Sequence, residues 1–169
     1  MIVMMAGLPG TGKSTLARAL AARVGGKVLD KDVIRATLFS PKLIVYSTKQ
    51  DDLVVQQMLD EAHSILRIHP DQVVILDGRP FSKKYQVDAV VNFAKQIKTP
   101  WRIIECVCPE PLALQRIETD ATHVARNRDA KLYHGVKAHF QPIRRRKLVL
   151  DTSASLTANL DQMERHLSA

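Results

Sequence analysis

The stretch Gly7 to Ser14 constrains the fold of this chain more than any other. It reads Gly-Leu-Pro-Gly-Thr-Gly-Lys-Ser and matches the pattern G-x-x-x-x-G-K-[ST] at every fixed position. The continuous apolar run 2–6 precedes it and predicts a buried strand, whereas residues 13–24 carry apolar side chains at helical spacing and predict a helix. A strand, a glycine-rich turn and a helix in this order are typical of a loop whose backbone N–H groups bind phosphate.

The chemistry of this loop indicates ATP and Mg²⁺ as ligands. We expect Lys13 to reach the β- and γ-phosphates during catalysis and the Ser14 hydroxyl to bind Mg²⁺. A glycine-rich turn that merely begins a helix, the alternative interpretation, would not need both side chains. The nucleotide-binding residues expected in this loop are Gly7, Leu8, Pro9, Gly10, Thr11, Gly12, Lys13, Ser14 and Thr15.

The pattern of apolar residues predicts an α/β fold. Strands are expected at 2–6, 27–29, 72–76, 101–107 and 147–150, and helices at 13–24, 30–39, 48–69, 85–97, 109–119, 132–140 and 156–167. Buried strands that alternate with helices imply a parallel sheet covered on both faces. We therefore predict a three-layer α/β/α sandwich with a five-stranded parallel sheet, formed by residues 1–169 as a single domain. The polar, weakly periodic residues at about 120–132 are expected to form a short lid.

Composition narrows the cellular setting and the partners. The chain has 169 residues, 46% hydrophobic, and 25 Lys and Arg against 17 Asp and Glu, which favours an anionic partner without separating nucleotide from nucleic acid. We expect no membrane span, because no window holds about 18 apolar residues, and no signal peptide, because the apolar start lacks a basic flank. The expectation is a soluble, cytoplasmic protein in which Cys106 and Cys108 are reduced core residues.

A carboxylate at the end of a neighbouring strand is expected to complete the metal site. Asp77 follows the apolar run 73–76 and is our candidate, together with Ser14, for a Mg²⁺ ligand. Aspartate before glycine is also a common turn residue, so a capping role for Asp77 is the alternative.

An acceptor site is expected where the second strand ends. Asp30 and Asp32 follow that strand, and Arg35 lies on the same face of the next helix as Asp32. Asp32 could accept a hydroxyl proton and Arg35 could orient the acceptor or neutralise its phosphate, which favours a hydroxyl acceptor. Alternatively, Asp32 caps the helix and Arg35 forms a surface ion pair. Arg79 is expected to bind an anionic group of the acceptor, unless it is a surface residue.

Further basic residues are candidates for contacts with the nucleotide. Arg126 and Arg128 lie in the expected lid, where an arginine could stabilise charge on the γ-phosphate; a solvated basic loop is the alternative. Arg116 could stack on adenine or contact phosphate, or simply lie on the surface. The run 144–147 is the most basic stretch and could contact nucleic acid, although a solvated loop is the simpler interpretation.

The sequence resembles the small P-loop kinases of the group that contains polynucleotide 5′-hydroxyl kinases and zeta toxins, and more distantly gluconate, shikimate and chloramphenicol kinases. The matching pieces span nearly the whole chain: 7–15, Asp32-x-x-Arg35, Asp77, Arg116, Asn127-Arg128-Asp129, 140–143 and 150–152. The resemblance implies a P-loop kinase fold, with Asp32 as general base, Arg35 as an acceptor-binding residue, Asp77 as the metal-side carboxylate, Arg116 as a nucleotide contact and Arg128 as the lid arginine. The sequence departs from the pattern at Asp120, where many relatives carry another lid arginine.

The leading hypothesis is an ATP-dependent phosphotransferase that moves the γ-phosphoryl group to a hydroxyl of a small or nucleotide-like acceptor. Two alternatives stay open: a kinase of nucleic-acid 5′-hydroxyl ends, and a regulatory module that binds ATP and transfers nothing. Neither the acceptor nor the choice between ATP and GTP follows from the residues.

Overall fold

Five parallel strands form one sheet in the order β2-β3-β1-β4-β5. The computed structural model describes residues 1–120 and 129–169. Its strands are β1 (Ile2–Ala6), β2 (Lys27–Asp30), β3 (Val74–Asp77), β4 (Trp101–Val107) and β5 (Leu148–Asp151). The predicted five-stranded parallel sheet is confirmed.

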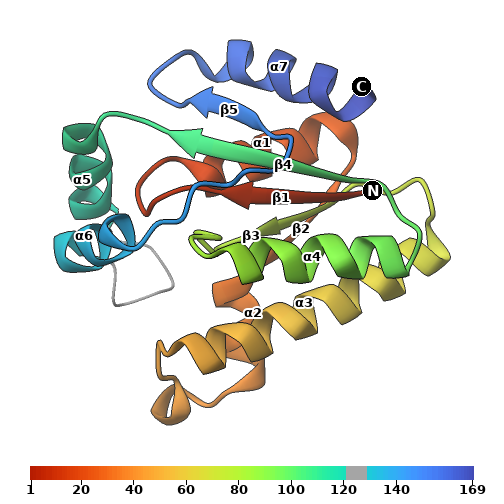
Figure 1. Ribbon diagram of the computed structural model, residues 1–169, viewed down its shortest axis with the longest axis horizontal. Helices are drawn as coiled ribbons and strands as arrows, with labels where there is room; N and C mark the ends of the chain where they lie inside the picture. Colours follow the sequence, from red (N-terminus) through yellow and green to blue (C-terminus); the bar gives the residue numbers. More distant parts are fainter. Residues whose placement is uncertain (121–128) are drawn as a thin grey trace.

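Helices cover both faces of this sheet, as the α/β/α prediction requires. They are α1 (Lys13–Val24), α2 (Lys31–Leu38), α3 (Thr48–Ile68), α4 (Lys84–Gln96), α5 (Glu110–Thr119), α6 (Ala130–Ala138) and α7 (Leu156–Ser168), with a short 3₁₀ helix η1 (Pro41–Leu43). Helices α1 and α7 lie on one side of the sheet, and α3 and α4 lie on the other (Figure 1).

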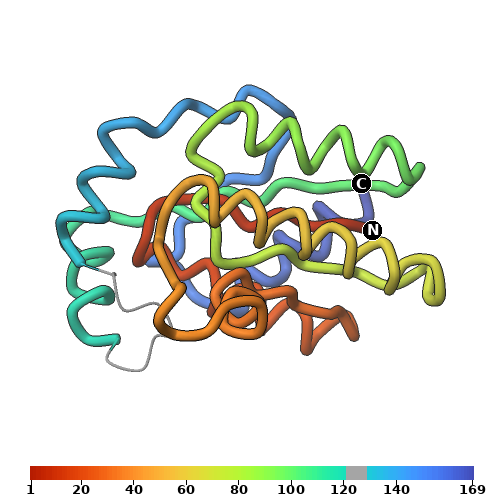
Figure 2. Tube along the Cα trace, turned by 90° about the horizontal axis from the view of Figure 1, so that it is seen from below, coloured from red at the N-terminus to blue at the C-terminus, as the bar shows by residue number. Residues whose placement is uncertain are grey.

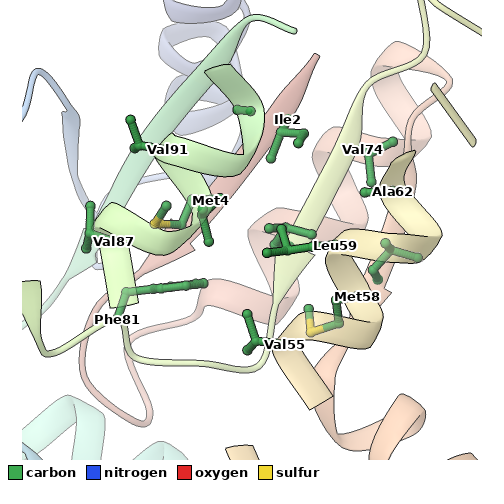
Figure 3. Close-up of a cluster of buried hydrophobic side chains, with 14 of the residues drawn as sticks. Ile2, Met4, Val55, Met58, Leu59, Ala62, Val74, Phe81, Val87 and Val91 are labelled. Carbon is green, nitrogen blue, oxygen red and sulfur yellow. The ribbon is translucent and has the colours of Figure 1, made fainter. Parts of the chain in front are cut away.

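Alternate side chains of the central strand supply the two cores. Ile2 and Met4 of β1 face α3 and α4, where they pack with residues such as Met58 and Val91 (Figure 3). Val3 of β1 faces the other way, toward the cluster beneath α1 and α7. Strands β1 and β3 are buried along their whole length, which explains why they read as continuous apolar runs rather than alternating ones. The edge strands β2 and β5 are partly exposed.

The carboxyl ends of all the strands meet at one edge of the sheet, because the strands are parallel. Helices α5 and α6 lie beyond this edge, and both chain termini lie at the opposite end of the molecule (Figures 1 and 2). A small apolar cluster of Ala113, Ile117 and Tyr133 joins α5 to α6. Most of the residues that we predicted to be functional lie in the loops and helix starts at this edge.

The boundaries differ from the predictions by one or two residues, for example in α6 and in β3. This strand begins at Val74 rather than at residue 72 and includes Asp77, whose backbone pairs with Asp30 of β2. Cys106 is buried and Cys108 is half-buried, and both are free thiols. Burial raises the pKa of Cys106 to about 12. No helix in 1–120 or 129–169 is long and apolar enough to cross a membrane.

Candidate active site

The predicted phosphate-binding loop lies between β1 and α1 at the carboxyl edge. Thr11 donates from Oγ1 to the Leu8 carbonyl at 2.7 Å, and Lys13 donates from Nζ to the same oxygen at 2.6 Å. Lys13 is only 8% exposed although it is a lysine. The Leu8 carbonyl oxygen therefore accepts two hydrogen bonds from within the loop, and one of them fixes the Lys13 side chain.

Two glycines let this loop pass close to other backbone segments. A Cβ atom on Gly7 would lie 2.3 Å from the Cys106 carbonyl oxygen at the end of β4. A Cβ atom on Gly10 would lie 2.3 Å from the Ala113 carbonyl oxygen on α5. Both residues also have positive φ angles, which residues other than glycine rarely adopt. The loop therefore needs glycine here both for conformation and for space.

A cavity of about 530 Å³ opens over this loop, and we call it the donor cavity. It extends from the phosphate-binding loop to α5 and to the segment after β5. Its lining residues are Gly10, Gly12, Lys13, Ser14, Thr15, Leu16, Arg18, Asp30, Asp32, Arg116, Asp120, Thr152, Ala154, Leu156 and Asn159.

Arg116 joins α5 to the segment after β5 across the donor cavity. It donates from Nη1 to Oγ1 of Thr152 and from Nη2 to the Thr152 carbonyl, both at 2.9 Å. Hydrogen bonds from Ser153, with a smaller effect of the Arg116 charge, lower the pKa of Asp151. Arg116 is half-buried and lines the donor cavity, so its predicted contact with the nucleotide stays a prediction.

Asp77 is buried at the end of β3 and has unmet hydrogen-bonding capacity. It is 1% exposed, and neither carboxylate oxygen has a partner within the described residues. The alternative of a turn cap is therefore wrong, since a cap would accept a backbone hydrogen bond. A buried carboxylate without donors is costly unless a cation binds it. Carboxylate and hydroxyl oxygens are ligands that Mg²⁺ prefers, so Asp77 and Ser14 fit such an ion.

A second cavity of about 380 Å³ lies on the other side of Lys13, and we call it the acceptor cavity. It is bounded by the start of α2, the segment before α3, the turn after β3 and α6. Three of its lining residues, Lys13, Ser14 and Asp32, also line the donor cavity. The two cavities therefore meet at a lysine, a hydroxyl and a carboxylate.

Asp30 and Asp32 have different positions at the start of α2. Asp30 caps the helix, because its Oδ1 accepts from the backbone nitrogens of Asp32 at 2.8 Å and Val33 at 3.3 Å. The alternative in which Asp32 caps the helix is thus wrong. Asp32 is 8% exposed and faces both cavities, whereas Asp30 lines only the donor cavity.

Asp32 belongs to a buried group of charges that joins α2 to α3. Arg35 donates from Nη1 to Oδ1 of Asp32 at 2.5 Å and from Nη2 to Oδ1 of Asp51. Lys31 adds an ion pair with Asp51 at 3.1 Å, and the Arg35 guanidinium lies 5.1 Å from the ring centroid of Tyr46. Arg35 is only 1% exposed, so the alternative of a surface ion pair is wrong, and it does not line the acceptor cavity.

Arg79 lies in the acceptor cavity, as its prediction as an acceptor-binding residue requires. It is 3% exposed, so the surface alternative is wrong, and it donates from Nη2 to Oδ1 of Asp52 at 2.6 Å. Lys83 also lines this cavity, whereas the Lys84 side chain is 81% exposed and pairs with Asp88.

The remaining basic residues predicted to contact the nucleotide or nucleic acid lie in the expected lid and in the run 144–147. Arg126 and Arg128 lie outside the described residues, as does most of the expected lid. The described part of that lid includes the start of α6, where Asp129 caps the helix by accepting from the Leu132 nitrogen at 2.7 Å. In the basic run 144–147, Arg145 pairs with Asp88 and Lys147 with Glu105. Half of that run is therefore neutralised by neighbouring acids.

Sequence reasoning missed Lys31, Asp51 and Asp52. The two aspartates lie in the first turns of α3 and contact Lys31, Arg35 and Arg79 from elsewhere in the chain. Adjacent acidic residues near a helix start are also favourable for the helix dipole alone, so the sequence holds no signal specific to these ion pairs.

Comparisons with known proteins identify a matching family and similar folds. A family model described as an AAA domain matches residues 2–143. None of the curated proteins matches the sequence. The structure of Kti12 from Chaetomium thermophilum in complex with ADP-AlF3 has a TM-score of 0.73 at 14% identity, with 100% of both chains covered.

Two kinases have similar structures. A gluconokinase from Sinorhizobium meliloti 1021 has a TM-score of 0.72 at 14% identity, with 98% of this chain and 90% of that chain covered. The APS kinase CysC of Mycobacterium tuberculosis, in complex with AMPPNP and APS, has a TM-score of 0.73 at 17% identity, with 99% and 97% covered. At these identities the likeness shows the fold, which is that of P-loop kinases.

Proposed function

Because this chain belongs to the AAA domain family, we propose that it is an ATP- and Mg²⁺-dependent kinase that phosphorylates a hydroxyl group of a small or nucleotide-like acceptor. One observation carries the proposal: the donor and acceptor cavities meet at Lys13, Ser14 and Asp32. An enzyme that transfers the γ-phosphoryl group only to water does not need the second cavity.

The donor side would hold the triphosphate by charge and by backbone hydrogen bonds. The N–H groups of the loop before α1 would bind the phosphates, and Lys13 would leave the Leu8 carbonyl to bind the β- and γ-phosphates. Ser14 and Asp77 would hold Mg²⁺, which supplies charge neutralisation on the phosphate oxygens. Arg116 is positioned to contact the base or a phosphate once ATP separates it from Thr152.

Asp32 would act as the general base on the acceptor side. The acceptor oxygen forms a bond to the γ-phosphorus while the bond to the β-phosphate oxygen breaks, ADP leaves, and the hydroxyl proton passes to the Asp32 carboxylate. Arg35 is buried behind Asp32, so we revise its predicted role from an acceptor ligand to a residue that fixes the carboxylate.

The finer assignments stay predictions. These are Arg126 and Arg128 as lid residues that stabilise the γ-phosphate, Asp30 as an acceptor contact, and membership of the polynucleotide 5′-hydroxyl kinase and zeta toxin group. Asp30 already caps α2, which leaves its second carboxylate oxygen as the atom available for such a contact.

Incubation with γ-labelled ATP and a panel of acceptors tests the proposal. The panel contains sugars, sugar acids, nucleosides, nucleotides, aminoglycosides and 5′-hydroxyl oligonucleotides. Label on one of these classes, absent with Lys13→Ala, supports the kinase. For the same acceptor, Asp32→Asn should keep the ATP affinity of the parent and lower turnover by about 10²- to 10⁴-fold. Equal turnover of Asp32→Asn and the parent would remove Asp32 from the mechanism.

A further inference from the structure

Arg79 is a buried cation whose hydrogen-bonding capacity is only partly used. Both of its hydrogen bonds leave from Nη2, to Asp52 at 2.6 Å and to the Tyr85 hydroxyl at 3.5 Å. Its Nε is buried and has no partner in the described part of the chain. A guanidinium is always charged and carries five N–H donors in a planar fork. Both bonds use Nη2, so Nη1, which has no hydrogen bond within the described residues, is the donor left for an acceptor atom of a ligand.

The backbone holds Arg79 in a fixed position relative to the phosphate-binding loop. The Gly7 nitrogen donates to the carbonyl of Pro80 at 3.0 Å, which ties the turn after β3 to the first residue of that loop. Phe81, the next residue, is fully buried among α3 and α4. The guanidinium therefore lies on a rigid segment, which suits a side chain that positions a ligand.

The charges around the acceptor cavity favour an anion there. Four basic side chains line it, from Lys13, Lys31, Arg79 and Lys83, against two acidic ones, from Asp32 and Asp51. Both acids already pair with Arg35, which lies behind the wall of the cavity. With Arg35 and Asp52, the partner of Arg79, included, five basic side chains stand against three acidic ones, so a positive excess remains.

Some of the remaining lining residues suit a hydroxyl-bearing molecule of small size. Thr48, Ser82, Tyr85 and Gln86 carry hydroxyl or amide side chains, and they line the cavity beside apolar residues such as Leu132 and Val136. Its volume of about 380 Å³ is near the lower end of the range for small-molecule sites.

We infer that the acceptor is a small polyhydroxylated molecule with an anionic oxyacid group, a carboxylate, phosphate or sulfate, and that Arg79 binds this group while Asp32 faces the hydroxyl. The inference rests on the proposed kinase function and names the substrate class of the same site. A planar guanidinium binds two oxygens of such a group at once, which would fix the orientation of the acceptor.

Anion binding to the nucleotide-loaded protein tests this inference without knowledge of the acceptor. The phosphate-binding loop is first saturated with AMPPNP and Mg²⁺, so that it cannot itself bind the probe. Inorganic sulfate, inorganic phosphate and acetate are then titrated separately and followed by amide chemical shifts in NMR spectra. Sulfate and phosphate represent a tetrahedral group and acetate a planar carboxylate, so the tightest probe indicates the chemistry of the acceptor.

Three variants decide the outcome. Arg79→Gln should weaken binding of the best probe by at least about tenfold, the scale of one charge-assisted hydrogen bond. Asp52→Asn removes the carboxylate that competes for Arg79 and should tighten binding several-fold, which keeps the test decisive if Arg79→Gln does not fold. Arg67→Gln on α3 changes an exposed arginine and should leave binding unchanged.

The experiment distinguishes failure of the anion-binding inference from failure of the proposed kinase function. If AMPPNP binds and no probe saturates, or if all variants bind a probe equally, Arg79 has only a structural role between the turn and α3, and the inference is wrong. If AMPPNP itself does not bind, the proposed kinase function is wrong, and the inference falls with it.

Discussion

Arg35 donates from Nη1 to Asp32 at 2.5 Å, and both residues are buried within the first turns of α2. The other terminal nitrogen of Arg35 binds Asp51 on α3. One guanidinium therefore sets the position of the proposed general base relative to a second helix.

Arg35→Lys should lower phosphoryl transfer while leaving ATP affinity unchanged. Lysine keeps the charge but cannot bridge two carboxylates with a planar fork, so Asp32 loses its fixed orientation. A displacement on the scale of 1 Å costs about 10²-fold in rate. Steady-state kinetics should show the loss in kcat, and calorimetry should show the ATP affinity of the parent.

Asp51→Asn is the matched change on the other side of Arg35, and it should reduce kcat in the same direction. Asp60→Asn, an exposed position on the same helix, is the control and should have no effect. If Asp51→Asn matched Asp60→Asn in kcat, the group of charges would have no role in positioning Asp32.

Asp77→Asn should leave the stability of the nucleotide-free protein unchanged or raise it, although the residue is buried. Its carboxylate oxygens have no partners within the described residues, so removal of the charge relieves a desolvation cost rather than breaking a bond. The same change should abolish the Mg²⁺-dependent increase in ATP affinity. Urea unfolding and calorimetry with and without Mg²⁺ measure the two effects.

The opposite pair of results would contradict the metal site. A large loss of stability together with an intact Mg²⁺ effect would mean that Asp77 is a structural residue and that another group binds the ion.

Gly10→Ala should destabilise the protein and weaken nucleotide binding. The new Cβ atom would lie 2.3 Å from the Ala113 carbonyl oxygen, at a φ of 76°. Strain of this kind costs about 1–3 kcal/mol, and relief requires the loop to move away from α5. Gly135→Ala on α6 is the control, because no atom lies within 4 Å of the added Cβ there. Helix propensity should make that variant neutral or slightly more stable, and equal losses in both would exclude the steric cause.

The free energy of unfolding should fall as the pH drops below about 6.5, partly because of His166. Burial, and then the charges of Arg102 and Arg146, lower the pKa of His166 from its ordinary value of 6.5. The unfolded chain therefore binds a proton more readily at His166, so the contribution of this residue to stability is constant above pH 6.5 and falls as the pH drops toward the lower folded pKa.

Urea unfolding at pH 7.5 and 5.5 measures this contribution. His166→Gln should reduce the difference in stability between the two pH values, because glutamine does not titrate. His69→Gln, at an exposed position, should leave the difference as in the parent. The same difference for both variants and the parent would assign the pH dependence to other groups.

Most of the features that could be predicted from the sequence depend on residues close together in the chain. The loop around Lys13 has its ligating groups within a few consecutive residues, so one motif between a strand and a helix places it. Asp77 and Arg79 could be placed because β3 lies next to β1 and a parallel sheet brings strand ends together.

The contacts that define the acceptor side are non-local, and the sequence holds no comparable signal for them. Arg35 looks like a ligand because it lies one helical turn from Asp32, yet Asp51, which holds it in place, is 16 residues further along the chain. Whether a side chain faces a cavity or a neighbouring helix depends on how α2 packs against α3. The burial of Arg35, and hence its revised role, became visible only in the assembled structure.

The fate of the γ-phosphoryl group is the most direct test of the proposed function. ADP and labelled product are measured together in the presence of the best acceptor from the panel. A kinase in which the two cavities meet at Asp32 transfers close to one label to the acceptor for each ADP formed, and Asp32→Asn forms both products more slowly but in the same ratio. Formation of ADP with all the label as inorganic phosphate, whatever acceptor is present, would contradict the account.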